Sequence, residues 1–119
     1  MWVQTEKETP VSKTEKAKGG TGVLESLEIQ NEKAPVCSSI IGYKRNTLKP
    51  GSSLGYHAHE GSSETIFILS GTCAYEDNEH RTYELHAGDS AYCGNGESHR
   101  VACQGDEPLV FMALILKEN

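Results

Sequence analysis

Short runs of alternating apolar and polar residues, separated by turn residues, make up most of the chain after residue 22. Runs of this kind, with glycine, asparagine or aspartate between them, are typical of β-strands joined by tight turns. The predicted strands are Val23–Ile29, Ser38–Leu48, Leu54–His59, Thr65–Leu69, Thr72–Asp77, His80–Leu85, Ser90–Cys93, His99–Cys103 and Leu109–Leu116. Strands this short and this closely spaced predict an all-β sandwich or barrel.

The last run, Leu109–Leu116, is apolar throughout, so its pattern alone is also compatible with a buried helix. Its short length and its position after Pro108 favour a strand that is buried on both faces. No long amphipathic helix is predicted elsewhere, so we expect little or no helix in the protein.

The first 18 residues differ in composition from the rest of the chain. They are rich in Thr, Glu, Lys and Ser, and they contain few apolar side chains to offset the entropy lost on ordering. We therefore expect a flexible arm at 1–18 and one globular domain at 19–119, since 119 residues is an ordinary size for a single domain. The run Gly19-Gly20-Thr21-Gly22 marks their junction and lacks the strand and helix context of a phosphate-binding loop.

Charge and cysteine content narrow the classes of partner. A formal net charge of -6, with no basic cluster beyond the N-terminal segment, argues against nucleic acid and anionic membranes as partners. The chain shows no apolar signal segment and no run long enough to span a bilayer, so we expect a cytoplasmic protein. The four cysteines have no C-x-x-C spacing, and Cys73 and Cys93 are expected to be small apolar residues within strands.

Three side chains within one short segment have the spacing of metal ligands. His57 and His59 are two apart, so in a strand both project from one face, whereas a helix would separate them by about 200°. Glu64 shares a strand face with Ile66 and Ile68, where an unpaired carboxylate is costly to bury. A metal ion removes that cost. Taken alone, a His-x-His pair is more often exposed, or satisfied within a core, than part of a metal site.

His99 supplies a further candidate ligand, because it begins a later strand and shares a face with Val101 and Cys103. Three imidazoles and one carboxylate form a site of intermediate hardness that can leave coordination positions open. Such a site suits one divalent transition metal ion, and manganese, iron, nickel, cobalt and zinc all remain candidates. The predicted metal ligands are His57, His59, Glu64 and His99.

The segments that carry these residues resemble the two sequence motifs of the cupin superfamily. Positions 51–71 read G-x5-H-x-H-x4-E-x6-G, which is similar to the complete first motif. Positions 88–103 are similar to the second motif, G-x5-P-x-G-x2-H-x3-N, with Gly94 in place of proline and Cys103 in place of asparagine. Neither departure falls on a metal ligand of the family. They affect the rigidity of a turn and a structural hydrogen bond.

The resemblance covers roughly Val23 to Leu116 and implies a double-stranded β-helix, the jelly-roll barrel of cupins, with the metal inside. Within the superfamily the chain is most similar to small single-domain bacterial members described as oxalate-decarboxylase-like or mannose-6-phosphate-isomerase-like. Such proteins are typically homodimers that exchange or add N-terminal strands. A homodimer is therefore expected, with the arm and the strand near Val23 as the segments involved.

Several residues are candidates to line the mouth of the barrel, because strands next to the histidines could aim them inward; they are Tyr43, Arg45, Tyr56, Tyr92 and Met112. Arg45 is of most interest, since a guanidinium in the pocket could clamp a carboxylate through two hydrogen bonds. The alternative is a solvated strand residue beside Lys44. His80 and His86 lie at predicted turns and are expected at the surface.

Two functions are compatible with these features. The first is a metal-dependent enzyme acting on a small carboxylate or sugar derivative, with decarboxylase, isomerase and dioxygenase chemistry all open. The alternative is a non-catalytic module that binds a small molecule in the barrel. A purely structural metal is disfavoured, because structural sites usually saturate with protein ligands and are often rich in sulfur. No general acid or base is assigned.

Overall fold

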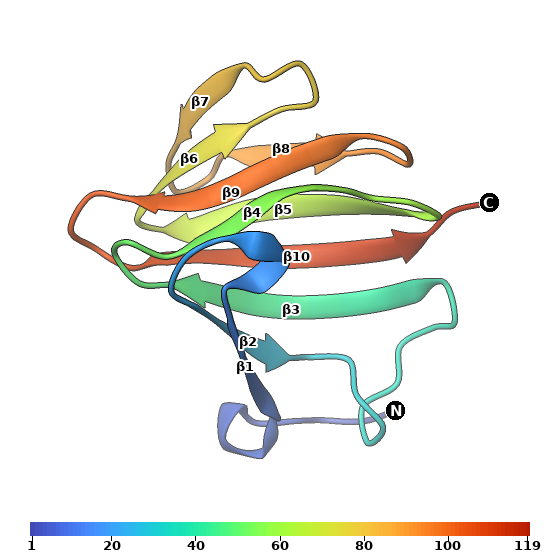
Figure 1. Cartoon of the computed structure of the whole chain (residues 1–119). Coiled ribbons are helices and arrows are strands. Elements are labelled where there is room, and N and C mark those ends of the chain that lie inside the picture. The colour runs from blue at the N-terminus through green and yellow to red at the C-terminus, as the bar shows by residue number, and fades with distance from the viewer.

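Ten strands account for most of the chain in the computed structural model, which describes residues 1–119 (Figure 1). Their bounds are β1 Val11–Glu15, β2 Val23–Glu28, β3 Ile40–Leu48, β4 Ser53–Ala58, β5 Ser62–Ser70, β6 Thr72–Glu76, β7 Thr82–Leu85, β8 Ser90–Cys93, β9 Ser98–Gln104 and β10 Leu109–Lys117. The helical parts are two single-turn 3₁₀ segments, η1 (Glu6–Glu8) and η2 (Ala17–Gly19). Neither is long or apolar enough to cross a membrane.

The strands form two antiparallel sheets. The larger sheet has six strands in the order β1-β2-β3-β10-β5-β8, and the smaller has four in the order β4-β9-β6-β7. Because β4 and β5 follow one another but lie in different sheets, as do β9 and β10, the chain repeatedly crosses between the layers. The all-β prediction is confirmed, and every predicted strand is present with ends displaced by three residues or fewer.

The long apolar run near the C-terminus is a strand, as its length indicated, but the prediction that it is buried on both faces is wrong. β10 lies inside the larger sheet, between β3 and β5 (Figure 1). Its odd-numbered residues Leu109, Phe111 and Ala113 are buried, whereas the even-numbered ones are half-buried. One face therefore belongs to the core and the other to the outside of the sheet.

The N-terminal segment differs from the flexible arm that its composition indicates. Residues Val11–Glu15 form β1, which pairs with β2 along five register positions from Val11 opposite Leu27 to Glu15 opposite Val23. Ala17, in η2, is 5% exposed and joins the hydrophobic core. The polar composition of 1–18 is explained by position, since β1 is an edge strand with most of its side chains in solvent.

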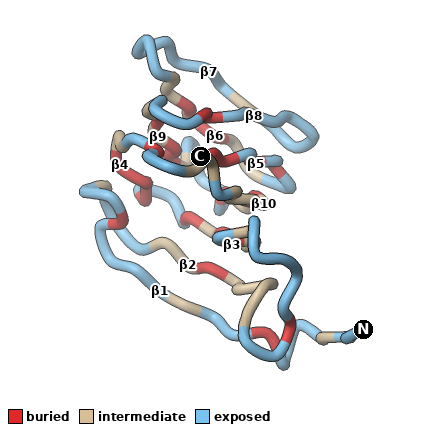
Figure 2. Tube along the Cα trace, turned by 90° about the vertical axis from the view of Figure 1, so that its right-hand side faces the viewer, coloured by how far each residue is buried: buried red, intermediate tan, exposed pale blue.

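The core lies where the inner faces of the two sheets meet, and Figure 2 shows the buried stretches gathered there. On β5 the predicted alternation holds, because Glu64, Ile66 and Ile68 are buried while Phe67 and Leu69 point outward and are exposed. Cys73 and Cys93 are buried as expected, and burial raises their pKa values to about 12 and about 11. The largest fully buried apolar side chains are Leu48, Ile66, Ile68, Val101, Leu109 and Phe111.

Candidate metal site

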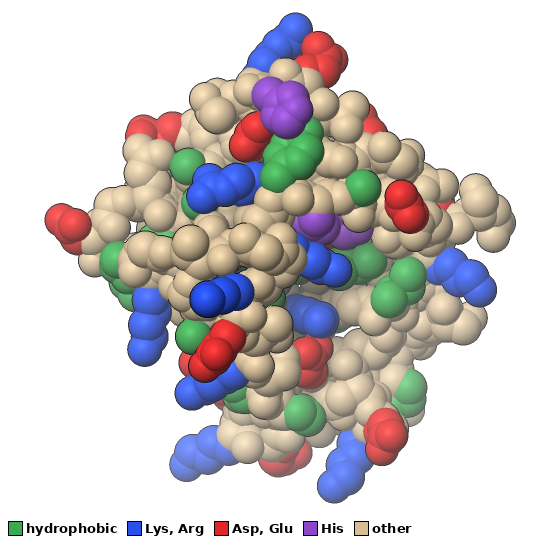
Figure 3. Space-filling view, viewed as in Figure 1, with side chains coloured by type: hydrophobic (Ala, Val, Ile, Leu, Met, Phe, Trp, Pro, Cys, Tyr) green, Lys and Arg blue, Asp and Glu red, His purple; other side chains and the backbone are tan.

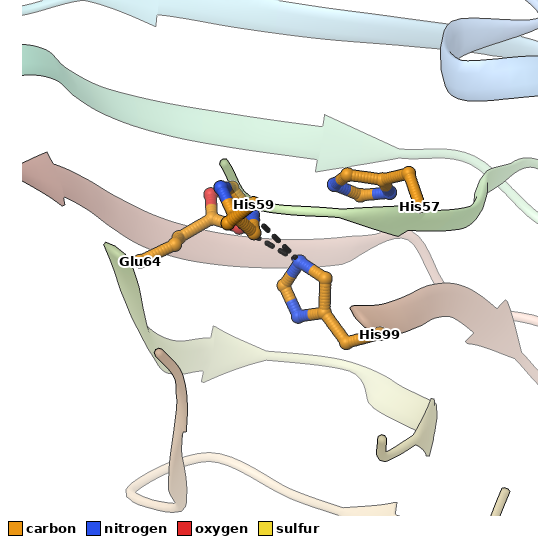
Figure 4. A group of neighbouring side chains, drawn as sticks. All are labelled: His57, His59, Glu64 and His99. Atoms are coloured by element: carbon orange, nitrogen blue, oxygen red, sulfur yellow. Dashed lines mark hydrogen bonds and ion pairs between the residues drawn. The ribbon is translucent and has the colours of Figure 1, made fainter. Parts of the chain in front are cut away.

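The four predicted ligands come from both sheets and meet between them (Figure 4). In the smaller sheet, His57 on β4 is the direct register partner of His99 on β9, and His59 follows the end of β4. In the larger sheet, Glu64 on β5 is paired with Cys93 of β8 and Ile115 of β10. The site therefore exists only when the two sheets are packed together.

The ligand atoms are close enough to bind one ion. The Nε2 atoms of His59 and His99 lie 3.1 Å apart, and the Glu64 Oε1 atom lies 3.2 Å from the first and 3.0 Å from the second. Candidate ligand atoms of all four residues lie within 4.8 Å of one another. Ligands at about 2.1 Å from a metal are about 3.0 Å apart at neighbouring octahedral positions and about 3.4 Å apart in a tetrahedron. The donor set therefore fits a divalent transition metal.

The second ring nitrogen of each histidine has its own partner, directed away from the cluster centre. His57 Nδ1 lies 2.7 Å from the Gly55 carbonyl oxygen, which accepts only, so Nδ1 carries the proton and Nε2 is free to bind a metal. His59 Nδ1 lies 3.2 Å from Ser62 Oγ, and His99 Nδ1 lies 2.9 Å from the Tyr75 hydroxyl. Metal-binding histidines are usually oriented by such outer hydrogen bonds.

The charge states of Glu64 and His57 are those that a metal cation requires. Burial alone would raise the pKa of Glu64, but hydrogen bonds from His59 and His99 outweigh it and hold that pKa at about 2. Burial lowers the pKa of His57, against the opposing effect of the hydrogen bond to Gly55. Burial also raises the pKa of Tyr75, so its hydroxyl stays neutral beside His99. An ionised carboxylate and a neutral imidazole are the metal-binding forms of these groups.

A pocket of about 260 Å³ opens beside His57, His59 and Glu64. Its polar wall includes Lys18 from the N-terminal segment, with Lys44 and Asn46 from β3. Apolar contacts come from Leu24, Leu54 and Ile115, among others. In Figure 3, histidine atoms are visible near the middle of the face, beside Lys or Arg side chains and a hollow in the surface. The volume lies just below the range of pockets that hold drug-sized ligands, about 300 to 1,000 Å³, so it suits a small molecule.

Arg45 and Met112 do not line this pocket, which corrects their assignment to the barrel mouth. They are register partners on β3 and β10, and Arg45 is also the partner of Leu27 on β2. All three lie on the outer face of the larger sheet, where Arg45 pairs with Glu6 at 3.3 Å. The alternative of a solvated strand residue is the one the structure supports for Arg45.

The candidate tyrosines also point away from the pocket. Tyr43 lies on the same outer face as Arg45, two residues along β3, and Tyr92 on β8 is 62% exposed. Tyr56 precedes His57 on β4 and therefore faces the opposite side, where its hydroxyl donates to the Asp77 carbonyl oxygen at 3.1 Å. These three tyrosines, like Arg45 and Met112, face away from the pocket because neighbouring strand positions face opposite sides of the sheet. His80 and His86 are exposed, as expected.

Beside the predicted His57, His59 and Glu64, the pocket is lined by Lys18, Lys44 and Asn46, which were not among the predicted site residues. Counting back in steps of two from the fully buried Leu48 places Asn46 and Lys44 on the inner face of β3, and this signal was available in the sequence. For Lys18 and Tyr75, strand alternation in the sequence does not predict a place at the site. Lys18 reaches the pocket through the path of the N-terminal segment, and Tyr75 reaches His99 through the pairing of β6 with β9.

The two departures from the second cupin motif are accommodated locally. The Gly94 N–H donates to Glu97 Oε1 at 2.7 Å, and the Glu97 N–H donates back to the Gly94 carbonyl oxygen at 3.0 Å. A proline at 94 has no N–H for the first of these bonds. At the other position, the Cys103 N–H donates to the Ser52 carbonyl oxygen, and its thiol donates to the Glu107 carbonyl oxygen at 3.1 Å. Both positions are therefore tied down by hydrogen bonds.

Comparison with known proteins identifies the family of the chain. The cupin domain family matches residues 45–115. A protein named oxalate-binding protein from Thermotoga maritima is 33% identical over 116 residues, covering 98% of this chain and 93% of that protein. Oxalate decarboxylase OxdC from Bacillus subtilis is 35% identical over 77 residues, covering 61% of this chain but 20% of that enzyme. The crystal structure of a predicted oxalate decarboxylase from Thermotoga maritima superposes with a TM-score of 0.89 at 31% identity, covering 98% and 99% of the two chains.

Replacing His59 and Glu64 together by alanine is expected to abolish metal binding. The affinity for Mn²⁺ or Zn²⁺, measured by calorimetry on protein stripped with chelator, should fall by at least roughly 100-fold, because ligand loss exceeds the effect of losing an outer partner. The matched control is the double variant His86→Ala with Glu84→Ala, since this exposed pair also has a 3.2 Å separation. Equal metal affinity in both double variants contradicts the ligand assignment.

Tyr75→Phe tests whether the hydroxyl on His99 Nδ1 orients that ligand. The variant should bind the same metal roughly 10- to 100-fold more weakly while keeping the fold, because the ring loses its outer hydrogen bond. Tyr56→Phe is the control, since its hydroxyl bonds to the backbone on the outer side of β4. If Tyr75→Phe and the wild type titrate identically, His99 does not depend on Tyr75 for its orientation.

Proposed function

The chain belongs to the cupin family, and we propose that it binds a small carboxylate of the oxalate class at one divalent metal ion. The ion is held by His57, His59, Glu64 and His99. Manganese, iron, nickel, cobalt and zinc all fit this mixed nitrogen and oxygen donor set. A bound ion supplies open coordination positions and positive charge to an incoming carboxylate.

The observation that carries the proposal is the charge of the pocket beside the ligand cluster. Its only acidic lining residue is Glu64, a member of the cluster, whereas Lys18 and Lys44 are both cationic. A divalent ion in a pocket lined by two lysines attracts an anion, and a volume of about 260 Å³ admits a small molecule such as a short carboxylate. The name of the full-length Thermotoga maritima relative, an oxalate-binding protein, supports the same ligand class.

Binding without turnover is the form of this function that the pocket favours. Apart from the cluster itself, no carboxylic acid, tyrosine or histidine lines the pocket to act as a general acid or base. The second candidate is a metal-dependent enzyme acting on the same ligand, since part of the chain is similar to an oxalate decarboxylase. In that case the two lysines are the proton donors within the pocket.

Oxalate is expected to bind the metal-loaded protein, and calorimetry checks this directly. Binding should weaken at least roughly tenfold after the metal is stripped, because the ion supplies the main contact. The His59→Ala, Glu64→Ala double variant, treated with the same metal, should behave like stripped protein. A parallel assay for formate and carbon dioxide separates a binder from a decarboxylase. Saturable binding of a sugar phosphate, with none of oxalate, contradicts the proposed ligand class.

We further propose that the protein is a homodimer that pairs through the outer face of its larger sheet. At one end of this face, β5 and β8 carry exposed apolar side chains, namely Phe67, Leu69 and Tyr92. Half-buried Met112 and Leu114 lie beside β5 on β10. Contiguous apolar surface of this kind marks association sites on soluble proteins. A cytoplasmic location, without nucleic-acid or membrane partners, stays a prediction from the sequence.

Phe67→Glu is expected to convert the dimer to a monomer in sedimentation experiments, because it places a charge in the proposed interface. Tyr83→Glu on β7 is the matched control, since Tyr83 is 44% exposed and Phe67 is 46% exposed, but on different sheets. Tyr83→Glu should leave the mass unchanged. A wild-type protein that sediments as a monomer at all concentrations tested refutes the proposal.

A further inference from the structure

The N-terminal segment contributes a cation to the pocket by an unusual backbone path. Residues 16–22, here called the N-terminal loop, lie across β4, and Lys18 within it lines the pocket next to His57. Lys16 and Lys18 both have positive φ angles, 50° and 54°, which side chains other than glycine rarely adopt. Two left-handed lysines so close together indicate a loop whose conformation is fixed by its surroundings.

Two glycines allow this loop to approach β4 closely. A Cβ atom on Gly55 would lie 2.2 Å from the Lys18 carbonyl oxygen, and one on Gly20 would lie 2.1 Å from the Ser53 carbonyl oxygen. The loop is also held by the buried Ala17 and by a hydrogen bond from the Ser53 N–H to the Thr21 carbonyl oxygen at 2.8 Å. The position of Lys18 is therefore built into the packing.

Lys44 faces the pocket from the other side, on β3, but its charge already has a partner. Its ammonium group lies 3.6 Å from Glu28 Oε1, and that oxygen also accepts a hydrogen bond from Ser12 at 2.8 Å. Lys18 forms no ion pair, since the lysine and arginine pairs of the protein involve Lys13, Lys44, Arg45 and Arg81. The free cation at the mouth is thus Lys18, with Lys44 as a partly neutralised neighbour.

We propose that Lys18 forms a second anion subsite, which receives the carboxylate that the metal does not hold. This inference rests on the proposed function and makes the ligand a short dianion. One carboxylate meets the metal beside His57, His59 and Glu64, and the other meets the Lys18 ammonium group. A monocarboxylate leaves Lys18 unpaired, so Lys18 favours a dianion over a monocarboxylate. Lys44 adds positive charge on the opposite wall.

The test measures oxalate and acetate affinity by calorimetry on Lys18→Gln, loaded in parallel with Mn²⁺ and with Zn²⁺. Glutamine keeps most of the side-chain length and removes the charge. Oxalate should bind roughly tenfold or more weakly to the variant, because a charge-assisted contact is lost. Acetate affinity and metal affinity should be unchanged, which also shows that the site is folded. Lys18→Arg should restore most of the oxalate affinity.

Lys16→Gln is the matched control, since Lys16 lies in the same loop with a similar backbone angle but does not line the pocket. It should bind oxalate as the wild type does. If Lys18→Gln binds oxalate with wild-type affinity, or loses oxalate and acetate affinity equally, the subsite is wrong and the metal-centred function stands. If the metal-loaded wild type binds no oxalate, the proposed function fails and the subsite fails with it.

Discussion

The burial of one carboxylate between two sheets is the constraint on which the rest of this structure depends. Glu64 is 6% exposed and shares its strand face with core residues, so without partners its charge would be strongly unfavourable there. The partners are imidazoles on the opposite sheet, and their hydrogen bonds hold the Glu64 pKa near 2. No buried side-chain nitrogen or oxygen lacks a hydrogen-bond partner. Folding therefore assembles the donor cluster at the spacing that an ion requires.

Main-chain hydrogen bonds also hold the cluster, because they join His59 to the turn at residues 94–97. The His59 N–H donates to the Glu97 carbonyl oxygen at 2.9 Å, and the Gly96 N–H donates to the His59 carbonyl oxygen at 2.6 Å. The turn that departs from the cupin motif at Gly94 thus holds one ligand by its main chain. Its hydrogen bond to Glu97 substitutes for the restriction that a proline ring imposes. A motif residue is dispensable where another interaction fixes the same turn.

The sequence predicted the features that depend on short-range spacing and failed where they depend on how distant segments pair. Strand alternation was enough for the core face of β5, and the two local motifs were enough to bring four candidate ligands together. β1 was missed because an edge strand with both faces largely in solvent has no apolar alternation to read. On β3 the residue that faces inward is Lys44 and not Arg45, because alternation from the buried Leu48 sets the inner face. The role of Tyr75 could not be predicted from the sequence, since its contact with His99 arises from the register of β6 against β9.

The residues that the sequence predicts and those that it does not have different places in the site. The donor cluster comes from segments that carry the family motifs, so chains with the same motifs are expected to have similar metal-binding side chains. The mouth of the pocket is formed by Lys18 and Lys44, which lie outside both motifs, and Lys18 depends on close glycine contacts between the N-terminal loop and β4. The ligand contacts beside the metal site of this chain therefore come largely from segments outside both motifs. These segments place two lysines, Lys18 and Lys44, at a small pocket beside the donor cluster.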